Sequence, residues 1–139
     1  GATHTILVTP GMDVPAVLRG IVRGGPELIL DSVGATATVA QALDGVMIGG
    51  TAVVVGLYEV HTPAPINLVS LVYGNKRLAG SFFGESKPLV DLPMLVEHYR
   101  DGRLPVEKLI SVRYPLEGLP QAFADLEAGA IARGVLEFA

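Results

Sequence analysis

The chain has 139 residues, of which 50% are hydrophobic and 17% charged, and it carries a formal net charge of −4 at pH 7. This length and apolar content predict a single domain with a substantial core over residues 1–139. The acidic balance and the lack of a Lys/Arg cluster argue against nucleic acid as a partner, and no apolar run is long enough to cross a membrane.

Cysteine is absent, which excludes disulfides, thiolate zinc ligands and a cysteine nucleophile from these residues. We expect a cytoplasmic protein. Residues 1–4 carry neither an initiator Met nor a signal-peptide pattern, so the chain is expected to begin inside a fold. The mean hydropathy of +0.48 is high for a small protein and predicts apolar surface that another domain or subunit covers.

Short apolar runs alternate with helical patterns along the first half of the chain. Residues 5–8 and 28–33 predict strands that end at turn signals. Residues 50–57 are β-branched and show no alternation, which predicts a strand buried on both faces. Strands separated by single helices at this spacing form right-handed crossovers, so the sequence predicts an α/β fold with a mostly parallel sheet.

Two helices are predicted between these strands. Asp13 is expected to cap the first helix, which the glycines at 24 and 25 end. Thr36 or Thr38 is expected to cap the second helix. Its apolar positions recur at helical spacing, which predicts a buried stripe made of Val39, Ala42, Leu43 and Val46.

The second half continues the alternation of helices and strands. Asn67 is expected to cap a short helix. The sequence further predicts strands at residues 77–83, 111–114 and 134–138, the last of which closes the sheet, and helices at 88–99 and 117–126. The expected inward side chains are Leu92, Leu95, Val96 and Tyr99 in the first of these helices, and Leu119, Ala122, Phe123 and Leu126 in the second.

Three features are candidates for a binding site. Residues 31–34 run from a strand into a glycine before a helix, where open α/β sheets hold ligands; an ordinary tight turn is an equally good interpretation. Residues 56–58 and 80–84 are glycine-containing strand ends that can admit a flat ligand, although plain loops are the more common case. Arg133 precedes the last strand and suits a pyrophosphate, whereas a solvated surface arginine is the usual alternative.

No complete active site is visible. His4, His61 and His98 lack metal-ligand spacing, and there is no Gly-x-Ser-x-Gly elbow, P-loop or Gly-x-Gly-x-x-Gly fingerprint. We therefore predict no catalytic residue and no metal ligand in this chain.

Five stretches, taken together and in this order, resemble the zinc-type medium-chain alcohol dehydrogenase family. They are distributed along nearly the whole chain, at residues 1–6, 31–34, 49–56, 75–84 and 129–134. The resemblance is to the carboxyl-terminal, nucleotide-binding half of that family's subunit. It implies part of a Rossmann fold with helices on both faces of the sheet, and NAD as the cofactor.

The resemblance also implies a role for eight residues in a cofactor cleft. On the adenine side these are Ser32 and Val33. The nicotinamide carboxamide would meet the backbone of Val55, Ser81 and Phe83, with Gly56 and Leu57 bordering the same pocket and Arg133 on the pyrophosphate. The strand from Arg77 to Phe83 resembles the one that pairs across the twofold axis of the family's dimers, which implies a homodimer.

The resemblance is incomplete in ways that matter for function. The family's catalytic domain with its zinc ligands, the glycine-rich phosphate loop and the acidic residue that holds the adenine ribose have no counterpart here. The main hypothesis is therefore a fragment of an NAD-dependent, zinc-containing alcohol or aldehyde dehydrogenase that is inactive by itself. A zinc-free NADPH quinone or enoyl reductase of the same superfamily, and a stand-alone dimerisation or nucleotide-sensing module, are the alternatives.

Overall fold

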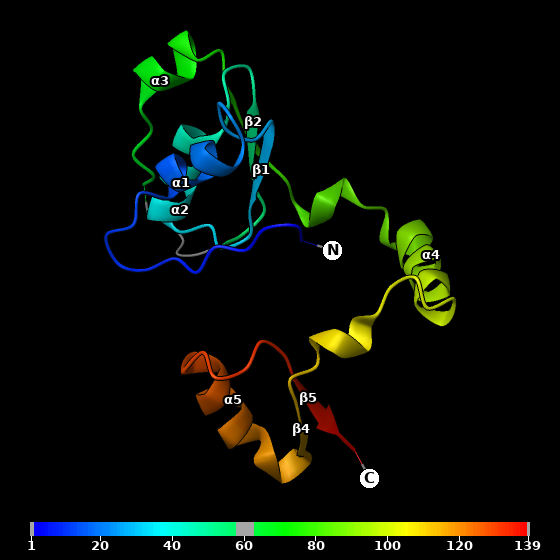
Figure 1. The fold of residues 1–139 in the computed structure, drawn as a ribbon. Coiled ribbons are helices and arrows are strands. Elements are labelled where there is room, and N and C mark those ends of the chain that lie inside the picture. Colours follow the sequence, from blue (N-terminus) through cyan, green and yellow to red (C-terminus); the bar gives the residue numbers. More distant parts are fainter. Residues whose placement is uncertain (1, 58–62, 139) are drawn as a thin grey trace. The chain divides into compact units, whose positions relative to one another are not determined.

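The computed structural model describes residues 2–57 and 63–138 and divides the chain into two compact units, Gly1–Glu85 and Ser86–Ala139 (Figure 1). Each unit has its own parallel sheet. The expectation that the last strand closes one continuous sheet is therefore wrong, because that strand pairs within the second unit. The prediction of a single domain stays a prediction.

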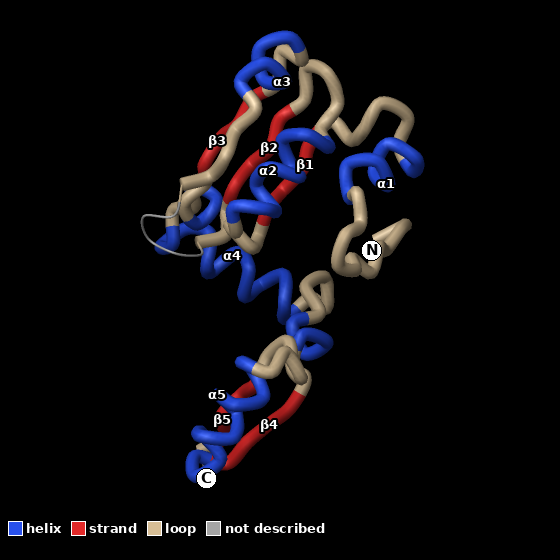
Figure 2. The backbone as a smooth tube through the Cα atoms, turned by 90° about the vertical axis from the view of Figure 1, so that its left-hand side faces the viewer, coloured by secondary structure: helices blue, strands red, loops and turns tan. Residues whose placement is uncertain are grey.

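The first unit is a three-stranded parallel sheet with helices between its strands (Figure 2). The strand order is β1-β2-β3, and Leu28 of β1 pairs with Thr51 of β2, which in turn pairs with Arg77 of β3. This confirms the parallel α/β fold. The elements are α1 (Val14–Ile21), β1 (Leu28–Asp31), α2 (Thr36–Gly45), β2 (Thr51–Val54), α3 (Leu68–Tyr73), β3 (Arg77–Gly80) and a short 3-10 helix (Phe83–Glu85).

Some predicted strands are shorter or absent in the structure. Residues 5–8 are irregular and Leu7 is 86% exposed, so the strand predicted there is wrong. A strand needs a hydrogen-bonded neighbour, and residues 5–8 have none in the described sheets. The strand predicted at 50–57 is regular only as far as Val54, because the amides of Val55 and Gly56 turn back to Asp31.

The core of the first unit lies between α2 and the sheet. All four residues of the predicted stripe are buried. Leu43 is 1% exposed and contacts Ala52 at the centre of the sheet, which is 0% exposed. Because the period of apolar positions fixes which face of a helix is buried, the sequence alone was sufficient for this prediction. Around this centre pack the partly buried side chains of Ile29, Leu71 and Leu78.

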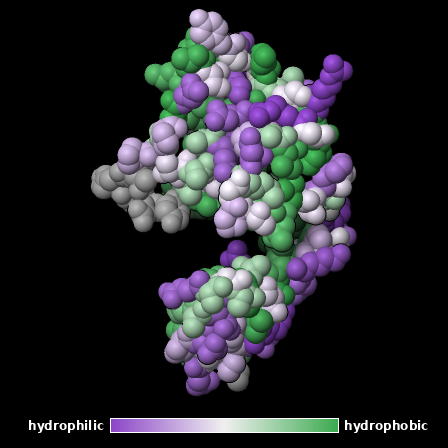
Figure 3. All heavy atoms as spheres, turned by 60° about the vertical axis from the view of Figure 1, so that its left-hand side comes forward, coloured by the Kyte–Doolittle hydropathy of each residue, from purple (hydrophilic) through white to green (hydrophobic). Residues whose placement is uncertain are grey.

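One face of this sheet is covered within the unit and the other is not. Side chains alternate between the two faces along a strand. Ile29 packs against the helical side, whereas its neighbours Leu28 and Leu30 are 55% and 64% exposed. Apolar residues consequently reach the surface (Figure 3), as the high mean hydropathy suggested.

Two of the three predicted helix caps are present in the structure. Asp13 accepts a hydrogen bond from the amide of Ala16 at 3.0 Å, which confirms its capping role. Asn67 does the same for Ser70 at 3.0 Å. The predicted threonine cap of α2 is wrong: Ala35 occupies the cap position, and the Thr38 hydroxyl donates to the Ala35 carbonyl instead of accepting from an amide.

The second unit pairs two parallel strands against one helix. Its elements are α4 (Pro88–Arg100), a short 3-10 helix (Val106–Leu109), β4 (Val112–Pro115), a second 3-10 helix (Leu116–Gly118), α5 (Leu119–Glu127) and β5 (Gly134–Glu137). The four predicted inward residues of α5 line a small cavity together with Ile131, Gly134 and Leu136. On α4 the four predicted inward residues are all exposed, from 40% for Leu95 to 57% for Leu92, so that prediction is wrong for the described residues. None of the helices in the described residues has the length and apolar character needed to cross a membrane.

A buried tyrosine ties β4 to α5. The Tyr114 hydroxyl donates to Asp125 Oδ2 at 2.7 Å, and Gln121 Nε2 donates to Asp125 Oδ1 at 2.7 Å. The hydrogen bond from Tyr114, and then that from Gln121, lowers the pKa of Asp125 below its usual 3.8. A depressed carboxylate pKa stabilises the fold above the unfolded value, and this stability is lost as the pH falls through the folded value.

We therefore expect Tyr114→Phe to lower the thermal midpoint near neutral pH, and the difference from wild type to shrink below about pH 4. Melting curves across the acid range measure this. Tyr73→Phe is the matched control, because Tyr73 is 86% exposed. A difference that stayed constant down to the lowest pH would show that the carboxylate is not the partner that matters.

Candidate functional site

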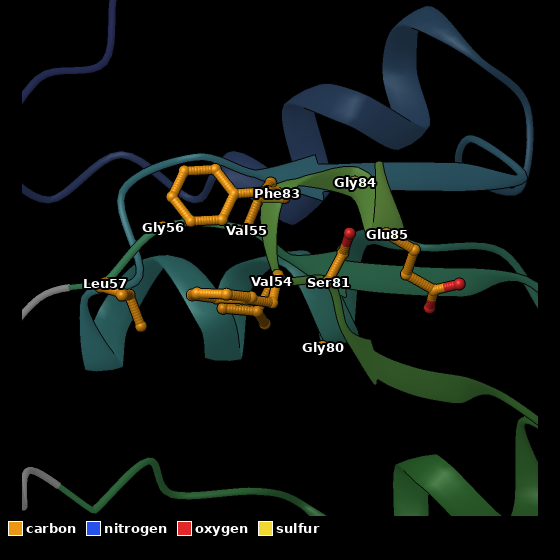
Figure 4. A pocket seen from close by; sticks show the side chains of 10 residues that line it. Val54, Val55, Gly56, Leu57, Gly80, Ser81, Phe83, Gly84 and Glu85 are labelled. Atoms are coloured by element: carbon orange, nitrogen blue, oxygen red, sulfur yellow. The ribbon is translucent and has the colours of Figure 1, made fainter. Parts of the chain in front are cut away.

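The carboxyl ends of β2 and β3 border a cavity of about 770 Å³ (Figure 4). Ligands of open parallel α/β sheets bind at this edge, beyond the carboxyl ends of the strands. The cavity walls are mainly apolar side chains and glycine backbone. Its lining residues are Val54, Val55, Gly56 and Leu57 after β2, and Gly80, Ser81, Phe82, Phe83, Gly84 and Glu85 after β3.

Asp31 shapes the turn beside this cavity. It is 6% exposed, and its two carboxylate oxygens accept hydrogen bonds from the amides of Val33 at 3.1 Å and Gly34 at 3.0 Å. Its backbone carbonyl accepts from the amides of Val55 at 2.9 Å and Gly56 at 3.0 Å. Asp31 therefore holds the chain segments after β1 and β2 together, and its buried charge is compensated by backbone donors.

Gly34 and Gly56 bring these two segments into direct backbone contact. Gly34 has a φ of +76°, and a Cβ on it would collide with the Gly56 carbonyl. Conversely, a Cβ on Gly56 would collide with the backbone of Ser32, Val33 and Gly34. Both positions require glycine, so the residues after β1 lie directly against one wall of the cavity.

The opposite wall is an unusual turn after β3. The strand predicted as far as Phe83 ends at Gly80. The chain then turns at Phe83, Gly84 and Glu85, which have φ values of 51°, 66° and 55° and cannot continue a strand. Non-glycine residues in this left-handed region cost about 1 kcal/mol or more each, and such strain concentrates at functional sites. The Phe82 and Phe83 rings meet edge to face at 4.6 Å between centroids.

Five of the eight predicted cofactor residues lie together in this cavity: Val55, Gly56, Leu57, Ser81 and Phe83. Ser32 and Val33 do not line it but belong to the turn that contacts Gly56.

Arg133 belongs to the second unit, just before β5. Its amide donates to Ser111 Oγ at 3.3 Å, and its carbonyl accepts from the Ser111 amide at 2.8 Å. Among residues 2–57 and 63–138 its guanidinium has no hydrogen-bond or ion-pair partner. The backbone around Arg133 is thus fixed while its charge is available.

Sequence reasoning did not assign Glu85, which also lines the cavity. Its position directly after Gly84 in a strand-end motif is the signal that could have identified it.

The donor set for zinc is missing from this part of the fold. The chain has no cysteine, and no group of three or more His, Asp or Glu side chains within the described ranges can hold a metal ion. Zinc therefore does not fit these residues. A dinucleotide is compatible with the mainly apolar cavity at the carboxyl ends of β2 and β3.

Comparison with known proteins identifies the family. Residues 1–97 match the zinc-binding dehydrogenase family, and the chain belongs to it. This confirms the resemblance to the zinc-type medium-chain dehydrogenases.

Particular relatives align with nearly the entire chain. Alcohol dehydrogenase B of Mycobacterium tuberculosis is 31% identical over 148 residues, which cover 99% of this chain and 37% of that protein. A zinc-binding-domain alcohol dehydrogenase from Burkholderia ambifaria superposes with a TM-score of 0.89 at 34% identity, covering 100% of this chain and 37% of that one. Benzyl alcohol dehydrogenase from Acinetobacter calcoaceticus superposes with a TM-score of 0.84 at 28% identity, covering 93% of this chain and 35% of that one. The chain thus spans about a third of the length of its relatives.

Proposed function

We propose that this chain is part of the nucleotide-binding domain of an NAD-dependent, zinc-containing alcohol or aldehyde dehydrogenase. The supporting observation is the cavity that the ends of β2 and β3 form together, beside the contact between Gly34 and Gly56. When bound, NAD accepts a hydride from an alcohol carbon, and the hydroxyl proton leaves separately to give the carbonyl product. The zinc would be held by residues outside this chain.

The cavity offers hydrogen-bonding groups that suit a carboxamide. The amide of Val55 donates to Asp31 and that of Ser81 to Val54. The carbonyls of Val55 and Ser81 accept none of the loop and turn hydrogen bonds within residues 2–57 and 63–138, so both are available as acceptors. The amide of Phe83 has no acceptor within residues 2–57 and 63–138 and is available as a donor. Two acceptors and one donor complement a primary carboxamide, and we assign them to the nicotinamide.

The remaining roles follow the family resemblance. In the first unit, Gly56 and Leu57 border the nicotinamide pocket, and Ser32 and Val33 line the adenine side. In the second unit, the resemblance assigns Arg133 to the pyrophosphate. In this arrangement the chain's own residues bind and orient the ring, whereas carbonyl polarisation is supplied from elsewhere. We propose the cytoplasm as its location.

The test begins with the protein expressed from its complete reading frame. We expect NADH fluorescence to change on binding, about one zinc ion or more per subunit by elemental analysis, and alcohol-dependent formation of NADH. The 139-residue chain alone is expected to produce no NADH from alcohols. Absence of nicotinamide dinucleotide binding by the full protein would overturn the proposal.

The alternatives give different results in the same measurements. A zinc-free reductase would bind NADPH in preference to NADH and contain no zinc, while reducing a quinone or an enoyl substrate. A stand-alone module would have a reading frame that begins at or just before Gly1 and would show no turnover. The reading frame and the zinc content therefore separate the three hypotheses.

We also propose a homodimer through β3. This strand lies at the edge of the described sheet, with β2 as its neighbour on one side. The amide of Arg77 donates to the Gly50 carbonyl just before β2, and that of Ser81 donates to the Val54 carbonyl of β2. Since alternate amides of a strand point to opposite sides, the amide of Gly80 points to the free edge. An unpaired edge of this kind can pair with a second copy.

Gly80→Pro is expected to convert the dimer to a monomer, because proline removes an amide from the free edge while the bonds to β2 remain. Gly80→Ala is the matched control and should stay dimeric, since a Cβ there meets no atom within 4 Å. Sedimentation velocity measures the outcome, with circular dichroism to verify folding. A folded Gly80→Pro dimer would rule out this edge as the interface.

A further inference from the structure

Glu85 is the one ionisable residue among those that line the cavity in the described structure. It lies on the Ser81 side of the cavity, at the other end from Leu57 (Figure 4). Its carboxylate makes no hydrogen bond or ion pair with any residue in the described part of the chain. A carboxylate beside an apolar cavity with no cation bound to it gives that cavity a negative potential.

The backbone fixes Glu85 at this place. Its amide donates to the Phe82 carbonyl at 3.0 Å, which closes the 3-10 turn over Phe83–Glu85. Its φ of 55° is in the left-handed region, an unfavourable conformation for glutamate that the turn imposes. The backbone that carries the Glu85 side chain is therefore part of the turn that forms this wall of the cavity.

Two positively charged side chains of the same unit make hydrogen bonds at the opposite, amino-terminal ends of the strands. Lys76 Nζ donates to the carbonyls of Leu43 at 2.8 Å and Asp44 at 3.1 Å, at the end of α2. Arg77 donates to the Gly49 carbonyl at 3.3 Å, just before β2 begins. These positive charges gather at the amino ends of the strands, whereas Glu85 follows the carboxyl end of β3.

We propose that Glu85 strengthens the binding of the oxidised nicotinamide ring relative to the reduced ring in this cavity. The inference rests on the proposed function, because it assumes that the cavity holds this ring. The oxidised ring is a cationic pyridinium and the reduced ring is neutral, so the two forms differ by one charge inside the same cavity. The Glu85 carboxylate attracts only the cation. Because Glu85 is exposed, water and salt screen this attraction, and the expected effect is largest at low ionic strength.

The test compares dissociation constants for the two oxidation states. The protein from the complete reading frame is titrated with NADH by fluorescence, and NAD⁺ is measured by displacement of NADH; the NADP pair is used if the wild type binds it more tightly. Glu85→Gln keeps the size of the side chain and removes its charge. We expect NAD⁺ binding to weaken about two- to tenfold at low ionic strength, with NADH binding unchanged.

Two controls make the result specific. Glu27→Gln removes an exposed charge at the amino end of β1, and should leave the ratio of the two constants unchanged. Raising the salt to about 0.5 M should reduce the Glu85 effect, because the interaction is screened. An unchanged ratio in Glu85→Gln, or an equal change in Glu27→Gln, would overturn this inference. Failure of the wild type to bind either form would overturn the proposed function instead.

Discussion

Gly56→Ala is expected to weaken nicotinamide dinucleotide binding at least tenfold and to lower the free energy of unfolding by about 1–3 kcal/mol. The added Cβ would collide with the backbone of Ser32, Val33 and Gly34, which cannot rotate out of the way as a side chain does. The segments after β1 and β2 must then separate, and the cavity wall that Gly56 forms moves with them. Fluorescence titration with NADH and urea denaturation measure the two effects.

A second glycine provides the control for this substitution. Gly20 lies in α1, and a Cβ on it meets no atom within 4 Å. Gly20→Ala should therefore leave binding unchanged and raise stability slightly, by about 0.5–1 kcal/mol, because alanine loses less conformational freedom in a helix. If Gly56→Ala bound NADH as tightly as Gly20→Ala, the contact between Gly34 and Gly56 would have no part in shaping the site.

The sequence predicted the position of the cavity through the strand-end glycines. Residues 56–58 and 80–84 were expected to admit a flat ligand. Gly56 and Ser81 both line the cavity, whereas Tyr58 lies outside the described residues. The approach of Gly34 to Gly56 was not predictable, because it depends on the distance between two turns that only the parallel pairing of β1 and β2 fixes. For Glu85 the sequence offers only its place directly after Gly84; the left-handed backbone angles of the turn are seen in the structure alone.

The strands show where local patterns are insufficient. Residues 5–8 have the composition of a strand, but no neighbour pairs with them in the described sheets, and composition cannot supply a neighbour. The predicted strand at residues 77–83 is longer than β3, which ends at Gly80. Phe82 and Phe83 are typical strand residues, but they follow the last residue of β3. The buried stripe of α2 was predicted correctly because helical periodicity is a property of the segment itself.

Leu43→Ala is expected to lower the free energy of unfolding by about 2–5 kcal/mol, since it removes a fully buried side chain and leaves a cavity. Leu43 is 1% exposed and belongs to the core cluster with Ala42 and Ala52. The loss should appear as a lower urea midpoint with an unchanged slope.

The decisive comparison is with Leu7→Ala. Leu7 belongs to the run at residues 5–8 that resembled a buried strand, yet it is 86% exposed. Its removal should change the free energy of unfolding by less than about 0.5 kcal/mol. Equal losses of unfolding free energy from both substitutions would mean that the Leu7 side chain is buried in solution. The core would then extend beyond α2 and the sheet. A large loss from Leu43 alone would fix the centre of the core where helical periodicity and the structure agree.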